Sequence, residues 1–192
     1  MVCGWLLATG WGMGRLAEYS LTAGTHGAGP ADWPADSTVA RKTGGFVAVV
    51  VLHPECPCSR ATVEELDSIM AQNARGLQAV ACFVQLPGLP PVEDSELWQR
   101  ARRIGGVRVE KDLRGEEARR FGARTSGEMR LYDEAGQLVF HGGVTAARGH
   151  VGDNPGKTAV LNLVGKQVHA EKPIATPVFG CALWDECIAP AS

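Results

Sequence analysis

The sequence predicts an α/β fold with a central mixed sheet flanked by helices. The main observation is that apolar, β-branched runs alternate with amphipathic segments between residues 46 and 165. Alternating strands and helices build a largely parallel sheet that helices cover on both faces. The second observation is the turn sequence EAGQ at residues 134–137, between two short apolar runs. It predicts a closing hairpin with antiparallel strands at the edge of the sheet.

The first predicted strand, helix and second strand are the clearest elements. Residues 46–52, FVAVVVL, form a continuous β-branched run, which is typical of a strand that is buried on both faces. Residues 59–73 show apolar side chains at helical spacing, and a second apolar strand is expected at 77–84. The acidic residues of the helix that are expected to face solvent are Glu64, Glu65 and Asp67.

Local signals place the remaining elements of this domain. Ser95 is a residue type that caps helices, and Asn154 followed by Pro155 is typical of a helix N-terminus. The predicted elements are, in chain order, a helix at 95–104, a strand at 107–112, a helix at 114–122 with a solvated Glu/Arg face, strands at 129–133 and 138–143, and a helix near 156–165.

Three segments lie outside the predicted domain, which spans residues 46–165. Residues 1–19 begin with an uncharged apolar stretch, for which three roles stay open: the end of a membrane anchor, a weak signal sequence, or a soluble arm that packs on the domain. Residues 20–45 are rich in Gly, Ala, Pro and Thr without a period, which predicts a linker. Residues 166–192 form a tail punctuated by proline.

The composition excludes several classes of protein. Lys and Arg number 19 and Asp and Glu 21, which gives a formal charge of -2. Such a chain has no positive field that would steer it onto nucleic acid. The six cysteines are too few for a disulfide scaffold and too unevenly spaced for a zinc ribbon. The cysteines are therefore candidates for individual reactive or ligand roles.

The strongest local motif is HPECPCSR at residues 53–60, between the first strand and the first helix. The first turn of a helix leaves N–H groups unpaired and carries a partial positive charge, which stabilises a thiolate and lowers its pKa. We therefore expect Cys56 to be the attacking thiol and Cys58 the resolving thiol, with Arg60 lowering the pKa further. A disulfide across the single residue Pro57 would close a small, strained ring, which favours an oxidising or labile form.

This region resembles the thioredoxin superfamily. FVAVVVLHPECPC is similar to the superfamily's strand and active-site loop, and FGARTSGEMRLYDEAGQLVFHGG to the segment with its cis-proline and final hairpin. A narrower resemblance is to bacterial RedB-like proteins with a thioredoxin-like domain, through the stretches HPECPCSRA, ARRFGARTSG, GGVTAARGHVGDN and TPVFGCALW. The resemblance implies a thioredoxin-like fold over residues 46–165. It also implies a membrane-associated or periplasmic location, and a soluble cytoplasmic location stays open.

The resemblance also assigns roles where this sequence departs from the superfamily's pattern. The usual redox pair has two residues between its cysteines, so Ser59 falls at the position of the second cysteine. Gly127 stands where the superfamily has the cis-proline that shapes the substrate groove, and glycine also allows a close backbone approach. Ser126 and Gly127 are therefore expected to face the cysteines, with His53 and Pro57 shaping the same loop.

Two further thiols, Cys181 and Cys187, lie in the tail. Three roles stay open for them: a structural disulfide if the protein is exported, a second thiol station that exchanges with the active site, or no role. The loop GGVTAARGHVGDN, residues 142–154, contains Arg148 and His150. It is expected to be either a loop that faces the site or an ordinary capped loop.

Three functions fit these features. The first is a thiol–disulfide oxidoreductase that acts on protein thiols or disulfides and needs no organic cofactor. The second is a copper-binding or copper-delivery module with Cys56, Cys58 and a histidine (His53, His141 or His150) as ligands, because paired thiolates suit Cu(I). The third is a thiol peroxidase in which Cys56 becomes a sulfenic acid and Cys58 resolves it, although the threonine usual before such a cysteine is missing.

Overall fold

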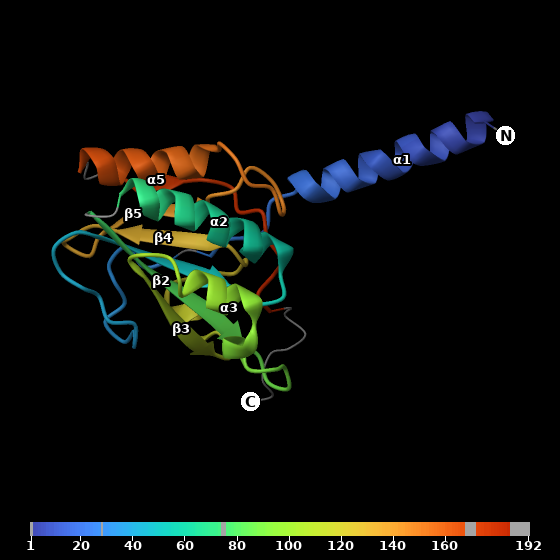
Figure 1. Cartoon of the computed structure of the whole chain (residues 1–192). Helices are drawn as coiled ribbons and strands as arrows, with labels where there is room; N and C mark the ends of the chain where they lie inside the picture. The colour runs from blue at the N-terminus through green and yellow to red at the C-terminus, as the bar shows by residue number, and fades with distance from the viewer. Residues whose placement is uncertain (1, 28, 74–75, 168–171, 185–192) are drawn as a thin grey trace.

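The computed structural model describes residues 2–27, 29–73, 76–167 and 172–184 (Figure 1). It contains one sheet with helices on both faces. In chain order, the elements are α1 (Val2–Leu21), β1 (Phe46–Leu52), α2 (Pro57–Gln72), β2 (Leu77–Gln85), the 3-10 helix η1 (Val92–Asp94), α3 (Glu96–Ala101), β3 (Val107–Leu113), α4 (Glu116–Arg120), β4 (Glu128–Tyr132), β5 (Leu138–Gly143), α5 (Pro155–Lys166) and β6 (Ile174–Ala175).

The strands lie in the order β3-β2-β1-β4-β5-β6. Strands β1, β2 and β3 are parallel, β4 is antiparallel to β1 and to β5, and β6 is parallel to β5. This mixed sheet confirms the predicted thioredoxin-like fold class. The prediction that the hairpin forms the sheet edge is wrong, because β6 in the predicted tail pairs with β5 and places both hairpin strands inside the sheet.

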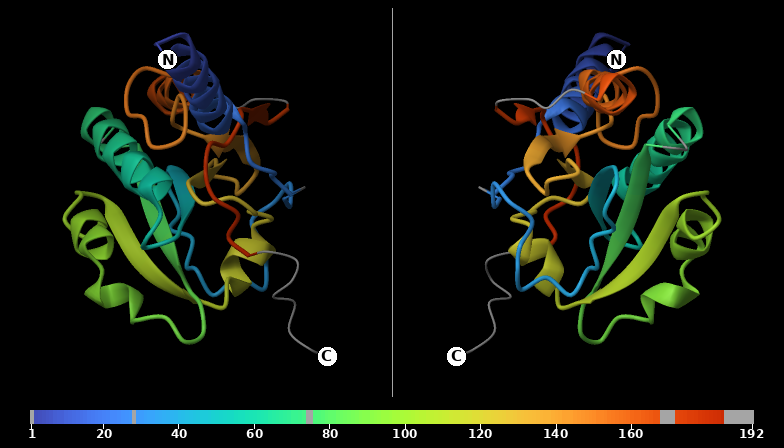
Figure 2. Two further views of the ribbon diagram at one scale, coloured as in Figure 1. Left: turned by 90° about the vertical axis from the view of Figure 1, so that its right-hand side faces the viewer. Right: turned by 90° about the vertical axis from the view of Figure 1, so that its left-hand side faces the viewer.

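Helices α2, α3 and α5 cover one face of the sheet, and α4 with irregular segments covers the other (Figures 1 and 2). The larger core lies under α2, α3 and α5 and includes Ala48, Val50 and Leu52 of β1. Val49 of the same strand joins a smaller cluster on the opposite face. Strand β1 is therefore buried on both faces, as its β-branched run predicts. The end of β1, where the HPECPC motif begins, is fixed by packing on both sides.

The segment predicted as a linker packs against the domain. The Trp33 ring makes edge contacts with Phe121 and Tyr132, at centroid distances of 5.0 and 5.1 Å, and Val39 is buried. The Trp33 N–H also donates a hydrogen bond to the Gly136 carbonyl over 2.8 Å. This part of the chain is irregular but packed, which the absence of a sequence period cannot show.

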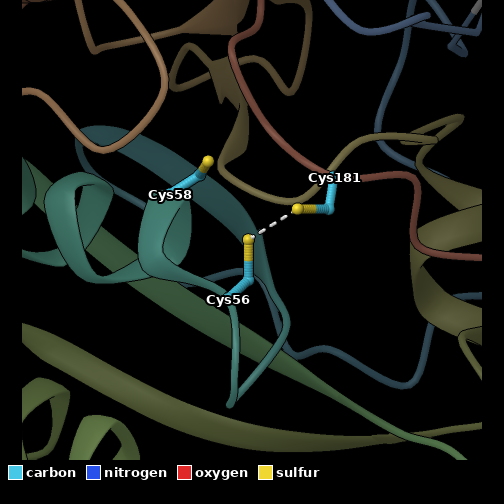
Figure 3. A group of neighbouring side chains, drawn as sticks. All are labelled: Cys56, Cys58 and Cys181. Carbon is cyan, nitrogen blue, oxygen red and sulfur yellow. Dashed lines mark hydrogen bonds between the residues drawn. The ribbon is translucent and has the colours of Figure 1, made fainter. Parts of the chain in front are cut away.

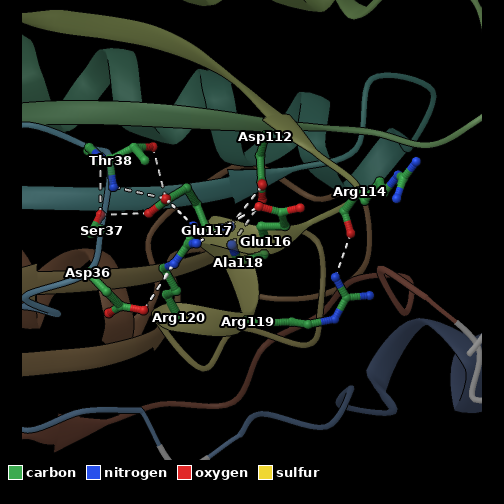
Figure 4. Close-up of polar contacts among 11 residues, drawn as sticks. Asp36, Ser37, Thr38, Asp112, Arg114, Glu116, Glu117, Ala118, Arg119 and Arg120 are labelled. Atoms are coloured by element: carbon green, nitrogen blue, oxygen red, sulfur yellow. Dashed lines mark hydrogen bonds and ion pairs between the residues drawn. The ribbon is translucent and has the colours of Figure 1, made fainter. Parts of the chain in front are cut away.

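A polar network fixes this segment to α4 (Figure 4). The Asp112 carboxylate accepts hydrogen bonds from the N–H groups of Glu117 and Ala118, each over 2.9 Å. The Glu117 carboxylate accepts from the Ser37 hydroxyl over 2.6 Å and from the Thr38 N–H over 3.0 Å. The prediction of a solvated face is wrong for Glu117, which is only 6% exposed.

Helix α1 projects away from the rest of the molecule (Figure 1). None of its described side chains is buried, and Trp5, Leu7 and Trp11 are 66%, 76% and 73% exposed. This exposure does not fit the predicted soluble arm that packs on the domain. Among the described residues, no helix is both long and apolar enough to cross a membrane.

Candidate functional site

The HPECPC motif connects the end of β1 to the start of α2. Cys56 is the N-cap residue of α2, with φ -89° and ψ 123°, and Pro57 occupies the first turn. The helix begins two residues before the predicted start at 59, because proline is pre-organised for the first helical position and lacks the N–H that would stay unpaired there. The Cys56 sulfur is thereby held at the positive end of the helix dipole.

Three thiols meet at this position (Figure 3). The sulfur atoms of Cys56, Cys58 and Cys181 all lie within 4.8 Å of one another, and those of Cys56 and Cys181 are 3.3 Å apart. Cys56 and Cys58 are buried, and Cys181 is partly exposed. The site thus contains the predicted pair and a third thiol from a distant part of the chain, whereas Cys187 lies outside the described residues.

The surroundings of Cys56 favour its thiolate. Its pKa is lowered to about 3, first by a hydrogen bond from the Cys58 thiol, and then by donors from Ser126, the Ser59 backbone and Cys181, which together outweigh the opposing effect of burial. The Ser126 hydroxyl donates to the Cys56 sulfur over 3.1 Å. The geometry therefore favours the thiolate form of Cys56 at neutral pH.

The other two thiols stay protonated. The pKa of Cys58 is raised by its hydrogen bond to Cys56 and by burial. The pKa of Cys181 is raised by burial first and then by its contact with Cys56. The Arg148 charge lowers both pKa values, but less than these causes raise them. The cluster contains one thiolate flanked by two thiols that donate to it.

Two serines of the predicted site connect the loop to β4. The Ser59 hydroxyl accepts from the His53 N–H over 3.0 Å and lies 3.2 Å from the Ser126 hydroxyl. Both serines are fully buried. Ser59, which takes the position of the usual second cysteine, therefore acts in this geometry as a hydrogen-bonding group that holds the loop.

Gly127 adopts a backbone conformation that favours glycine. Its φ is +87°, and a Cβ added there would lie 2.5 Å from the Thr62 Oγ1 atom of α2. Its N–H donates to the Val51 carbonyl over 2.7 Å, which ties this turn to the end of β1. The described residues contain no cis peptide bond, so the turn is built with a positive-φ glycine.

The C-terminal segment, residues 176–184, crosses the site beside this turn. The Ser126 N–H donates to the Cys181 carbonyl over 2.8 Å, and the Leu183 N–H donates to the Arg124 carbonyl over 3.0 Å. Between them, Thr125 and Ala182 form an antiparallel bridge. The sequence left a thiol station beside the active site as one of three open roles for Cys181, because this pairing joins residues that are far apart in the chain and the tail has no period.

Other predicted site residues lie differently. The exposed Arg60 side chain is 3.9 Å from Glu96, and it is not among the groups that lower the pKa of Cys56. The His53 ring accepts from the Glu55 N–H over 3.3 Å, and the described cluster of metal-ligand residues does not include it. Arg148 of the 142–154 loop lowers the pKa values of Cys58 and Cys181. The sequence left open whether this loop faces the site.

Glu65 of α2 holds the 142–154 loop through a hydrogen bond. It is fully buried on α2, where it accepts from the Gly152 N–H and pairs with Lys157 over 2.8 Å. The prediction that Glu65 faces solvent is wrong, because the loop and α5 cover this side of α2.

No family model matches the chain, and no curated protein matches it either. Among solved structures, the chain is similar to a hypothetical protein from Sinorhizobium meliloti 1021, with 23% identity, a TM-score of 0.59 and coverage of 87% of this chain and 97% of that chain. It is also similar to an uncharacterized conserved protein from Geobacillus kaustophilus, with 19% identity, a TM-score of 0.60 and coverage of 86% and 94%. A secreted disulfide oxidoreductase from Mycobacterium tuberculosis, homologous to E. coli DsbE, matches at 13% identity with a TM-score of 0.48, over 65% of this chain and 83% of that chain.

The fold is thioredoxin-like. Sequence identities below 25% show a shared fold and do not show a shared activity. The activity has to be inferred from the site.

Proposed function

We propose that this protein is a thiol–disulfide oxidoreductase in which Cys56 is the attacking thiolate. The observation that supports this most directly is the hydrogen bonding of the Cys56 sulfur at the N-terminus of α2, which lowers the pKa of Cys56 to about 3. A thiolate is the form that attacks a disulfide. Two protonated thiols within 4.8 Å supply the second thiol that such a reaction needs.

The proposed reaction has two steps. The Cys56 thiolate attacks one sulfur of a partner's disulfide, which forms a mixed disulfide and releases the partner's other sulfur as a thiolate. A second thiol of this protein then attacks the Cys56 sulfur and releases the partner fully reduced. Cys58 is the resolving thiol that the sequence predicts. The reaction needs no organic cofactor, and its partners are protein thiols or disulfides.

The test follows thiols during a single turnover. The reduced full chain is mixed with a peptide disulfide, and free thiols are counted with time. We expect two protein thiols to be lost per peptide disulfide reduced, and we expect Cys56→Ser to abolish the reaction. Cys3→Ser is the matched control, because Cys3 is an exposed free thiol on α1. Equal rates in the Cys56→Ser variant and the parent would refute the proposal.

A second candidate function, binding of Cu(I), is favoured by the three-sulfur cluster. Cu(I) prefers soft thiolate ligands, and three sulfurs within 4.8 Å of one another could surround a single ion. Cys181 replaces the predicted histidine as the third ligand. The test is copper content after anaerobic gel filtration of the full chain: this candidate requires one Cu(I) per chain, lost on Cys181→Ser and retained on Cys3→Ser. No specific observation favours the peroxidase alternative.

We also propose that α1 brings the protein to a membrane surface. Its uncharged first turns expose large apolar side chains such as Trp5 and Trp11, and such a helix can lie in the lipid interface without crossing it. Co-flotation of the full chain with phospholipid vesicles, lost in a Trp5→Glu and Trp11→Glu double variant, would support this. A parent chain that stays with the soluble fraction would contradict it. The periplasmic location and the narrower RedB-like kinship stay predictions.

A further inference from the structure

We propose that the C-terminal segment, paired with the backbone of residues 124–126, is an internal substrate, and that Cys181 is the thiol that resolves Cys56. This inference rests on the proposed oxidoreductase function and changes its second step. The oxidised protein would then contain a Cys56–Cys181 disulfide in place of the predicted Cys56–Cys58 disulfide.

The sulfur positions support this pairing. Cys181 presents its sulfur 3.3 Å from that of Cys56, so a bond of about 2.05 Å requires a movement of little more than 1 Å. Cys58 lies in the first turn of α2, with Pro57 between it and Cys56. A disulfide across one residue would have to deform that turn, where the proline ring fixes φ. The tail can therefore close the bond with less disturbance of the helix.

The backbone contacts resemble the binding of an extended peptide. The segment pairs antiparallel with residues 124–126. The contacts are the Ser126–Cys181 and Leu183–Arg124 backbone hydrogen bonds and the Thr125–Ala182 bridge. Addition of an extended strand to an exposed backbone edge is a common mode of peptide recognition.

The fit is close on both sides of Cys181. A side chain at Gly180 would collide with the Ser126 carbonyl oxygen, so only glycine allows this approach. Leu183 is buried in the cluster that contains Val51 and Val84. The Trp184 ring lies 4.3 Å from the Arg119 guanidinium. These contacts hold the segment beside Ser126 in the structure, in which Cys56 and Cys181 are both free.

Arg148 also holds the C-terminal segment. Its guanidinium donates to the Gly180 carbonyl and, over 3.0 Å, to the Tyr19 carbonyl at the end of α1. The same charge lowers the pKa of Cys181, which aids the loss of the Cys181 proton when the thiol attacks. The loop from residues 142 to 154 thus contributes a positioning residue to the site.

The chemistry balances as follows. The Cys56 thiolate and a partner disulfide give a mixed disulfide and one partner thiolate. Cys181 loses its proton to solvent and attacks the Cys56 sulfur, and the second partner sulfur leaves as a thiolate. Two protein thiols are oxidised to the Cys56–Cys181 disulfide, and the partner disulfide gains two electrons. Cys58 remains a thiol that donates to the Cys56 thiolate before the reaction. A protein partner can dock only while the segment is displaced.

Peptide mapping of the oxidised full chain tests this pairing. The Cys187→Ser variant is oxidised with glutathione disulfide, quenched with acid, alkylated, digested with trypsin and analysed by mass spectrometry. Trypsin places Cys56 and Cys58 in one peptide, residues 43–60, and Cys181 in another, residues 167–192. We expect these two peptides to be linked, with the link kept after Cys58→Ser and lost after Cys56→Ser.

The outcomes separate this inference from the proposed function. An internal disulfide within peptide 43–60, with Cys181 alkylated, would overturn the inference and leave the oxidoreductase standing. A link that survives Cys56→Ser would also overturn the inference, because it would join Cys58 to Cys181. No disulfide in either place would refute the proposed function itself.

A second variant tests the position of the C-terminal segment without removing any sulfur. Gly180→Ala should displace the segment from Ser126, and we expect it to slow formation of the linked peptides at least tenfold while iodoacetamide still labels Cys56. Gly105→Ala is the control, because a Cβ there has no neighbour within 4 Å and the backbone φ at Gly105 is not positive. Equal rates of linkage in the two variants would contradict the proposed seating of the segment.

Discussion

Ser126 contacts Cys181 through its backbone and Cys56 through its side chain. Its N–H donates to the Cys181 carbonyl over 2.8 Å, and its hydroxyl donates to the Cys56 sulfur over 3.1 Å. One residue of the turn before β4 thus aligns the backbone that carries one thiol and stabilises the thiolate of the other. This double contact explains how the C-terminal segment is held beside the first turn of α2.

Removal of the Ser126 hydroxyl should raise the pKa of Cys56. In Ser126→Ala the thiolate loses one donor, and a hydrogen bond to a charged group of about 1.5 kcal/mol corresponds to about one pKa unit. The pH dependence of iodoacetamide labelling at Cys56 measures this shift. Ser68→Ala, on α2 and about three turns from Cys56, is the control. The same pH profile of labelling in Ser126→Ala and in the parent would show that the hydroxyl does not stabilise the thiolate.

The reactivity of Cys56 should be nearly independent of pH over the neutral range. Because its pKa is lowered to about 3, the thiolate is already the main form at pH 5, whereas an ordinary thiol with a pKa of about 8.5 reacts about tenfold more slowly for each pH unit below that value. Labelling rates between pH 5 and pH 8 check this, with Cys3 as an internal reference. A tenfold fall per unit at Cys56 would contradict the lowered pKa.

A side chain at Gly127 should destabilise the fold. Gly127→Ala meets both a positive φ of +87° and the Thr62 hydroxyl, whereas Gly149→Ala meets a positive φ of +71° with nothing within 4 Å. The backbone effect alone is about 1–2 kcal/mol, and the steric conflict should add about 1–3 kcal/mol. Urea unfolding of both variants gives the difference. Equal losses would mean that Thr62 moves aside freely.

Glu117 should stabilise the fold in a pH-dependent way. Burial opposes its ionisation, but hydrogen bonds from Ser37 and Thr38 and the Arg120 charge outweigh burial and lower its pKa. Its contribution is therefore present above the unfolded value near 4.5 and is lost as pH falls through the lower folded pKa.

The Glu117→Gln variant checks this at two pH values. At pH 7 we expect a loss of about 1–3 kcal/mol in the free energy of unfolding, because buried hydrogen bonds to a charged acceptor are weakened. At pH 3 the variant and the parent should differ less. Glu116→Gln, one residue earlier and exposed, is the matched control. A loss at Glu117 that does not depend on pH would point to packing alone.

The sequence predicts most of the sheet, because β-branched runs and helical spacing are local patterns that tertiary packing here does not override. It predicts the position of Cys56 at the start of α2 for the same reason, since a strand, a proline and an amphipathic helix follow one another within a short stretch. It leaves a place for Cys181 at the site as one of three open roles, because an antiparallel bridge between Thr125 and Ala182 joins segments with no shared pattern. It also misplaces Glu65 and Glu117, whose burial depends on partners from distant loops.

The reduction potential of the cysteine cluster tests the central claim most directly. The full chain is equilibrated in glutathione buffers of graded potential under nitrogen, and free thiols are counted after acid quenching. We predict a reversible two-electron transition within the range of known oxidoreductases, roughly -120 to -270 mV, abolished by Cys56→Ser and unchanged by Cys3→Ser. A cluster that stays fully reduced across this range, or a transition that persists without Cys56, would contradict the assignment of this site as a thiol–disulfide oxidoreductase.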